Sequence, residues 1–139
     1  MTDFTVMAVE LIRSARLFDG VPYAYAATAR GTDLVFTAGA CPLDSQGKVV
    51  APGDIVAQAR QMLDNLRAVL DDCGATLHDV LKTTVYVASG DRGDLVAAWS
   101  EVASAFGDHD APSTLLGVAM LGYPDQLVEI EAIAAGPAA

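Results

Sequence analysis

Residues 54–73 constrain the fold more than any other stretch, because apolar side chains recur in them at spacings of three and four. This periodicity predicts a long helix with one apolar face. The face consists of Ile55, Ala59, Met62, Leu63, Leu66, Val69 and Leu70. Residues 52–54 mark the start of the helix, and Gly74 follows its end, where glycine often closes a helix. A helix with such a face needs a second layer to pack against.

Strand-like segments lie on the N-terminal side of this helix. Residues 23–29 alternate weakly, and residues 34–40 form a compact apolar run. Between them, residues 30–33 predict a hairpin turn in which Gly31 supplies a positive φ. Residues 6–14 fit either a strand or the start of a helix, so we assign no element to them.

More strands and a second helix follow. Residues 76–79 fit a capping box, and the β-branched residues 80–89 predict a strand. Apolar residues at helical spacing predict a helix over residues 94–106. Residues 113–121 and 127–134 predict two final strands. A short ribbon around Gly47 adds a third strand before the first helix. The order β-β-β-α-β-α-β-β lacks strict alternation, so we expect an α+β fold: a mixed β-sheet with two helices packed on one face.

The composition fits a single domain over residues 1–139. Hydrophobic residues make up 53% of the chain but aromatic residues only 6%, so the core would consist of small side chains. The second face of the sheet would then be too apolar to remain in water. We therefore expect this face to pack against another copy of the chain.

The charge and the cysteine usage limit the partners and the location. A net charge of −10 disfavours nucleic acid, whose phosphates need clustered Lys and Arg, so no nucleic-acid partner is expected. No apolar run of about 18 residues predicts a membrane span, and no signal-peptide pattern is found. Cys41 and Cys73 lack the spacing of a disulfide framework, so we expect a cytoplasmic protein with reduced thiols and no membrane partner. Cys73 would lie in the core at the end of the helix face.

Two carboxylates share one face of the last strand. Val128 and Ile130 alternate with Glu129 and Glu131, so the apolar and acidic residues point to opposite sides. Two interpretations are open. The glutamates either face solvent at the surface of the sheet or form an acid/base site, in which their charges would influence each other.

Several segments together resemble the RidA/YjgF family. They are "PY" at 22–23, "LVFTAG" at 34–39, "PLD" at 42–44, "GDIVAQARQMLDNLRAVLDDCGA" at 53–75, "DVLKTTVYV" at 79–87, "FGDH" at 106–109 and "VEIEAIA" at 128–134. The resemblance implies the chorismate-mutase-like fold of that family and a homotrimer with small-molecule sites in the clefts between subunits. It also implies hydrolysis of an enamine or imine of a small metabolite, with no metal and no cofactor.

The resemblance also assigns candidate site residues. Glu129 matches the family's catalytic glutamate, which would move a proton to and from water. Tyr23 matches a pocket tyrosine, and the backbone at Gly39 and Thr114 would orient the ligand. The family binds the carboxylate of its substrate with an arginine, but Ser113 stands at that position. The sequence therefore lacks the anion clamp that the resemblance leads us to expect.

Three other positions also depart from the family pattern. Ala40, Trp99 and Tyr25 stand where the family has polar side chains, which predicts a more apolar pocket for a neutral or larger ligand. Whether Tyr25, Trp99, Glu131 or Cys41 lines the cleft stays open at this level, although Trp99 fits either the core or a pocket wall. Arg16 is a candidate to replace the missing cation.

The remaining chemistry-bearing residues give several alternatives. Cys41 could be a small buried thiol or a nucleophile, but a nucleophile needs a nearby base and a lowered pKa. His109 matches a family histidine and is expected to be structural. The two histidines and two cysteines lack ligand spacing, so no metal site is expected. The alternatives to an enzyme of this type are a non-catalytic small-molecule-binding or interaction protein and an endoribonuclease, which the acidic charge disfavours.

Overall fold

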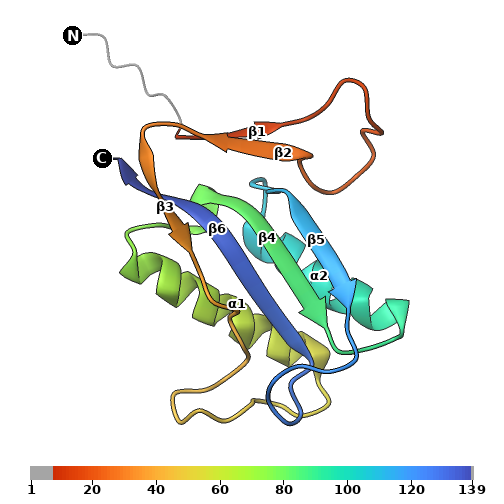
Figure 1. The fold of residues 1–139 in the computed structure, drawn as a ribbon. Coiled ribbons are helices and arrows are strands. Elements are labelled where there is room, and N and C mark those ends of the chain that lie inside the picture. Colours follow the sequence, from red (N-terminus) through yellow and green to blue (C-terminus); the bar gives the residue numbers. More distant parts are fainter. Residues whose placement is uncertain (1–7, 139) are drawn as a thin grey trace, which may run out of the picture.

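A computed structural model describes residues 8–138 and shows a mixed sheet with both α-helices on one of its faces (Figure 1). The elements are β1 (Val9–Ile12), β2 (Ala26–Ala29), β3 (Thr32–Phe36), α1 (Ile55–Asp72), the 3₁₀ helix η1 (Leu77–Asp79), β4 (Val80–Val87), α2 (Arg92–Phe106), β5 (Ser113–Gly117) and β6 (Val128–Ala138). The α+β class predicted from the sequence is confirmed.

The main sheet has the strand order β3-β6-β4-β5. β6 runs antiparallel to both of its neighbours, whereas β4 and β5 are parallel. A parallel pair requires a crossover connection, and α2 supplies it between β4 and β5. β6 therefore lies inside the sheet, with hydrogen-bonded neighbours on both edges.

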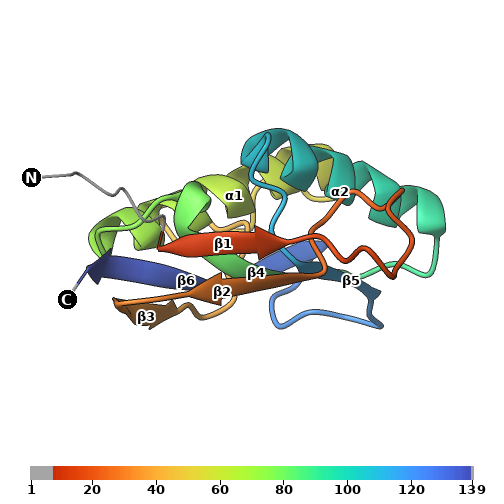
Figure 2. The same cartoon turned by 90° about the horizontal axis from the view of Figure 1, so that it is seen from above.

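Alternation along β6 sorts its side chains between the two faces of the sheet, as the sequence predicted. Val128, Ile130 and Ala132 are buried in the core together with Met62 and Leu66 of α1. Figure 2 shows α1 and α2 on the same side of the sheet. The small side chains of β6 allow the helices to approach the sheet closely.

The other side of the main sheet is called the open face. It comprises Leu34 and Phe36 of β3, Glu129, Glu131 and Ile133 of β6, Lys82, Thr84 and Tyr86 of β4, and Thr114 and Leu116 of β5. Phe36 is 70% exposed and Leu116 43% exposed. Large apolar side chains thus lie beside charged ones on a surface that no helix covers (Figure 2).

The hairpin predicted at residues 30–33 is wrong. Gly31 has φ 59° and does turn the chain, but β2 pairs with β1, and β3 pairs with β6. Residues 9–12, within the stretch that the sequence left unassigned, form a strand and give β2 a partner upstream. The β1–β2 ribbon crosses above the upper end of the main sheet in Figure 1.

The start of α1 agrees with the prediction, but two residues predicted to lie in the core, Val69 and Cys73, do not lie there. The helix begins after Asp54, as expected, and the Asp54 side chain accepts a hydrogen bond from the Ala57 amide at 3.0 Å. Val69 is 37% exposed and Cys73 is exposed, so placing them in the core was wrong. The buried row instead runs at spacings of four from Gln58, which is fully buried, and the two exposed residues lie beside that row.

The remaining bounds differ only at their ends. The capping box over residues 76–79 is confirmed at η1. α2 begins at Arg92, two residues earlier than predicted, and β5 ends at Gly117 instead of residue 121. A side chain at Gly117 would collide with the backbone oxygen of Ser89, at 2.8 Å from a Cβ atom, so the chain passes closely there and then leaves the sheet.

Candidate functional site

Glu129 lies near the start of β6 on the open face, opposite Tyr86 of β4. Its side chain is half-buried. The Cys41 thiol and the Gln126 side-chain amide each donate a hydrogen bond to Oε1 of Glu129, both at 3.1 Å. The same carboxylate oxygen thus accepts a hydrogen bond from each of two side chains.

The second oxygen of this carboxylate lies against Gly39. A Cβ atom at Gly39 would collide with Oε2 of Glu129 and lie 2.8 Å from its Cγ. Within the described residues, no donor reaches Oε2. The absence of a side chain at Gly39 therefore leaves room for the carboxylate and leaves one of its oxygens unbonded.

The surroundings of Cys41 keep its thiol protonated. Burial, followed by the hydrogen bond to Glu129, raises the pKa of Cys41 to about 11. A nucleophilic cysteine needs the opposite shift, so the structure opposes that interpretation. Cys41 is half-buried and donates to the candidate catalytic carboxylate. The sequence did not reveal this relation, because 88 residues separate the two partners.

Two amide side chains of α1 hold the segments that flank Glu129. Asn65 Nδ2 donates to the carbonyl oxygen of Cys41 at 2.8 Å. Gln58 accepts a hydrogen bond from the Leu127 amide, also at 2.8 Å. Neither residue was predicted from the sequence, although their spacing of seven places them on one face of the helix.

Glu131 has a separate environment. The Tyr86 hydroxyl donates to Glu131 Oε1 at 2.6 Å, and this hydrogen bond raises the pKa of Tyr86. A hollow of about 270 Å³ beside Glu131 is also lined by Phe36, Thr37, Lys82, Thr84, Ala132 and Ile133. Glu131 thus shares the open face with Glu129 but none of its hydrogen-bond donors.

Tyr23, Trp99, Ser113 and Thr114 come together near the start of β5. They line a hollow of about 460 Å³ with Pro22 and Leu115. A second hollow of about 250 Å³ shares Pro22, Trp99 and Ser113 and extends along α2. The Ser113 hydroxyl accepts a hydrogen bond from Thr83 at 2.6 Å. Trp99 is therefore a wall of both hollows, and this group contains three of the residues predicted to bind the ligand.

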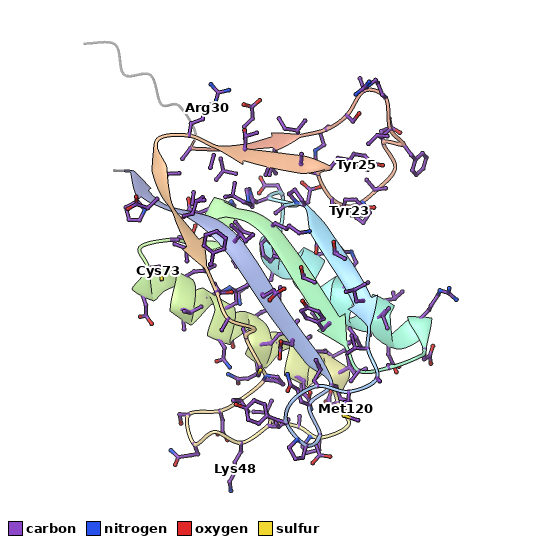
Figure 3. All side chains as sticks on the ribbon, viewed as in Figure 1. Tyr23, Tyr25, Arg30, Lys48, Cys73 and Met120 are labelled. Atoms are coloured by element: carbon purple, nitrogen blue, oxygen red, sulfur yellow. The ribbon has the colours of Figure 1, made fainter. Side chains whose placement is uncertain are left out.

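Tyr25 lies beside Tyr23, with its ring edge-on at a centroid distance of 5.9 Å (Figure 3). Its hydroxyl donates to the Phe18 carbonyl oxygen at 2.6 Å. Tyr25 therefore stabilises the loop between β1 and β2 and does not line the hollow beside Tyr23. Ala40 pairs with Ile130 through its backbone.

A guanidinium group approaches the smaller hollow, but it comes from Arg13 and not from Arg16. Arg13 donates to both carboxylate oxygens of Asp110, which lines that hollow. This hydrogen bonding holds the pKa of Asp110 below its usual value. Arg16 is exposed, and its side chain has no hydrogen-bond partner in the described part of the chain. The Arg13 guanidinium is thus already paired with an anion, whereas Lys82 Nζ donates to Thr114 Oγ1, at 3.3 Å, beside the larger hollow.

Within one chain, the candidate residues form two separate groups. Glu129 lies level with Leu116 in the sheet, whereas Ser113 lies three residues earlier on β5, about 10 Å away along the strand. Ser113 also points to the opposite face of the sheet. Figure 3 shows Tyr23 at the end of the sheet near the ribbon and Met120 at the other end.

The histidines have structural contacts. His109 Nε2 lies 2.8 Å from the carbonyl oxygen of Val80, and the two histidine rings, His78 and His109, lie 5.7 Å apart. Over residues 8–138, no three His, Cys, Asp or Glu side chains are grouped to hold a metal ion. In the same residues, no helix has the length and apolar character needed to cross a membrane.

The fold and these contacts define a class of small α+β domain, with two helices on one face of a mixed sheet and a fixed carboxylate on the other. Residues 20–136 match the family described as Endoribonuclease L-PSP. A RutC family protein of Pyrococcus horikoshii is 36% identical over 110 residues, which cover 79% of this chain and 85% of that protein. The 2-iminobutanoate/2-iminopropanoate deaminase of Escherichia coli is 34% identical over 122 residues, covering 84% of this chain and 92% of the enzyme.

A solved structure shows the same architecture. The crystal structure of YyfB, a conserved Rid family protein from Yersinia pestis, has a TM-score of 0.86 and 30% identity. The match covers 93% of this chain and 99% of that one. The chain therefore belongs to the Endoribonuclease L-PSP family, also known as the RidA/YjgF family, and the resemblance found in the sequence is confirmed.

Proposed function

We propose that this protein hydrolyses the C=N bond of a small imine, or of the enamine from which the imine forms. One observation carries the proposal: the Glu129 carboxylate is held through one oxygen, while its other oxygen is unbonded. A proton acceptor in such a setting suits the addition of water to an imine. The Escherichia coli relative is named as a deaminase of imino acids, which supports the same reaction class.

The complete site would form between copies of the chain. Glu129 and Gly39 belong to one group of residues, and Tyr23 and Ser113 belong to the other, which lies too far away in the same chain. A homotrimer in which the open face of one protomer packs beside the β5 edge of the next would bring the two groups of neighbouring protomers together. The exposed Phe36 and the other apolar residues of that face support such packing.

The chemistry needs one proton acceptor and one water. Oε2 of Glu129 takes a proton from the water as the water oxygen bonds to the carbon of the protonated imine, which gives a neutral carbinolamine. The proton on Glu129 then passes to this amine nitrogen. The C–N bond breaks, its electron pair leaves with ammonia, and the hydroxyl proton passes to Glu129 as the carbonyl forms. One water is consumed, and nothing is oxidised or reduced.

The substrate would carry a neutral, apolar group and no carboxylate. Ser113 stands where the family has its arginine, and Trp99 and Leu115 line the same hollow. Arg13 is paired with Asp110. A neutral hydroxyl in place of a bidentate guanidinium lowers the affinity for a carboxylate about a hundredfold or more. The net charge of −10 also disfavours a ribonucleic acid substrate, despite the description of the family.

The test compares two imines made in situ. A flavin amine oxidase generates a neutral imine from benzylamine, an amino-acid oxidase generates a carboxylate-bearing imine, and semicarbazide traps whatever is not hydrolysed. We expect faster turnover of the neutral imine. Glu129→Gln should lower turnover by about a hundredfold or more. Glu131→Gln is the matched control, because Glu131 lies on the same strand and face but bonds to Tyr86.

Three results would contradict parts of this proposal. Equal turnover by Glu129→Gln would remove Glu129 from its role. Preference for the carboxylate-bearing imine would overturn the neutral pocket. No turnover of either imine, with a small molecule that co-purifies in the cleft, would favour the non-catalytic binding protein instead.

A further inference from the structure

We infer that Cys41 and Gln126 are positioning residues for Glu129: they bind its Oε1 and so leave Oε2 to face the attacking water. This inference rests on the proposed function. The geometry behind the inference does not depend on the proposed function, since both donors reach the same oxygen at 3.1 Å. A carboxylate whose two oxygens each accepted two hydrogen bonds would have no free lone pair for proton transfer.

The two donors come from different parts of the chain, and each is fixed in place. The Cys41 carbonyl oxygen is held by Asn65 of α1 at 2.8 Å. The Gln126 side chain is only 4% exposed. Its Oε1 accepts a hydrogen bond from the Tyr123 amide at 3.1 Å, which orients the amide so that its nitrogen faces Glu129. Rigid donors restrict the rotation of the carboxylate more than solvent would.

The thiol is suited to this task at neutral pH. A thiol donates only while it is protonated, and the pKa of Cys41 is raised to about 11, first by burial and then by the bond to Glu129. The S–H group therefore stays a donor over the whole range in which a carboxylate acts as a base. Gly39 completes the arrangement, because any side chain there would collide with Oε2.

The first experiment uses Cys41→Val and Cys41→Ser. Valine removes the donor and keeps an apolar side chain of similar size, whereas serine restores a hydroxyl donor. We expect Cys41→Val to lower kcat about tenfold with little change in KM, and to move the acidic limb of the pH–rate profile upward by about one pH unit. Cys41→Ser should restore both values. A merely structural role of Cys41 would not move the pH profile, so an unchanged profile in Cys41→Val would overturn the inference.

The role of Gln126 is tested in a double variant. Gln126→Leu in the Cys41→Val background should lower kcat toward the level of Glu129→Gln, because the carboxylate then loses both of its fixed donors. If kcat of this double variant equals that of Cys41→Val alone, Gln126 has no positioning role. Urea unfolding of each variant shows whether the protein is folded.

A second measurement needs no turnover. The rate at which iodoacetamide alkylates Cys41 is followed by mass spectrometry against pH, in a Cys73→Ala background that removes the exposed thiol. We expect the midpoint near 11 to fall in Glu129→Gln, but not in the control Glu131→Gln. An unchanged midpoint in Glu129→Gln would overturn the contact itself. A protein that shows the shift but hydrolyses no imine would refute the proposed function and leave the contact in place.

Discussion

Gly39→Ala is the sharpest test of the site, because it adds a single carbon where the structure has no room for one. The new Cβ would overlap Oε2 of Glu129 and lie 2.8 Å from its Cγ. Gly39 is not among the residues with positive φ, so alanine fits the backbone. The atoms in the way belong to a side chain that can rotate, so we expect Glu129 to move and the fold to persist.

The magnitudes separate function from stability. When Glu129 rotates away, it loses its hydrogen bonds to Cys41 and Gln126, each worth about 0.5–1.5 kcal/mol net. Replacing glycine by alanine returns about 0.4–1 kcal/mol through the unfolded chain. The free energy of unfolding should therefore fall by no more than about 2.5 kcal/mol. Loss of a positioned base should lower turnover about 10²–10⁴-fold.

Two assays on the same variant measure these effects. Imine turnover with semicarbazide trapping gives the rate, and urea denaturation gives the free energy of unfolding. Gly90→Ala is the matched control, since a Cβ there meets no atom within 4 Å and its φ is also not positive. If Gly39→Ala turns over as fast as Gly90→Ala, the placement of the carboxylate against Gly39 does not matter for catalysis, and the mechanism is wrong. A stability loss far above the stated limit would show that the side chain cannot rotate.

Two further predictions concern the supports of the site. Gln58→Met should lower the free energy of unfolding by about 2–4 kcal/mol, because Leu127 loses its buried acceptor and the Asp125 carbonyl loses its donor. Gln61→Met removes one hydrogen bond to Asn65 from a half-buried side chain and should cost less than about 1.5 kcal/mol in the same urea titration. Arg13 lowers the pKa of Asp110, so this pair stabilises the fold above pH 3.8 and loses its effect as the pH falls through the lowered pKa. The free energies of unfolding of wild type and Arg13→Gln should differ by at most about 1 kcal/mol at pH 6, because the pair is exposed, and should converge once the pH falls below the lowered pKa of Asp110. A difference that persists at the lowest pH would refute the assignment.

The sequence predicted the layers well because periodicity reports burial. The apolar row of α1 and the alternation of β6 each place their residues on the correct face, and the capping box at residues 76–79 lies where expected. The predicted burial was wrong where an apolar residue is exposed or a polar residue is buried. Val69 is apolar but exposed, and Gln58 is polar but buried, because its amide meets backbone groups of a distant loop.

Strand pairing and the contacts of the site were harder to predict from the sequence. Local turn chemistry at Gly31 indicated a hairpin, but each of the two strands found a different partner. Glu129 was predicted as a site residue through its family match, whereas its hydrogen bonds with Cys41 and Gln126 were not predicted from the sequence. The Tyr86–Glu131 and Arg13–Asp110 pairs likewise join residues 45 and 97 positions apart, and no local pattern reports such contacts.

The inner position of β6 has a consequence for synthesis of the protein. β3 and β4 are both complete before residue 88, yet each must wait for residues 128–138 to leave the ribosome before it can pair on that edge. Until then, the nascent chain holds an apolar helix without its full sheet. Closing these distant pairings late slows folding, and the partly made chain keeps apolar surface exposed until residues 128–138 arrive.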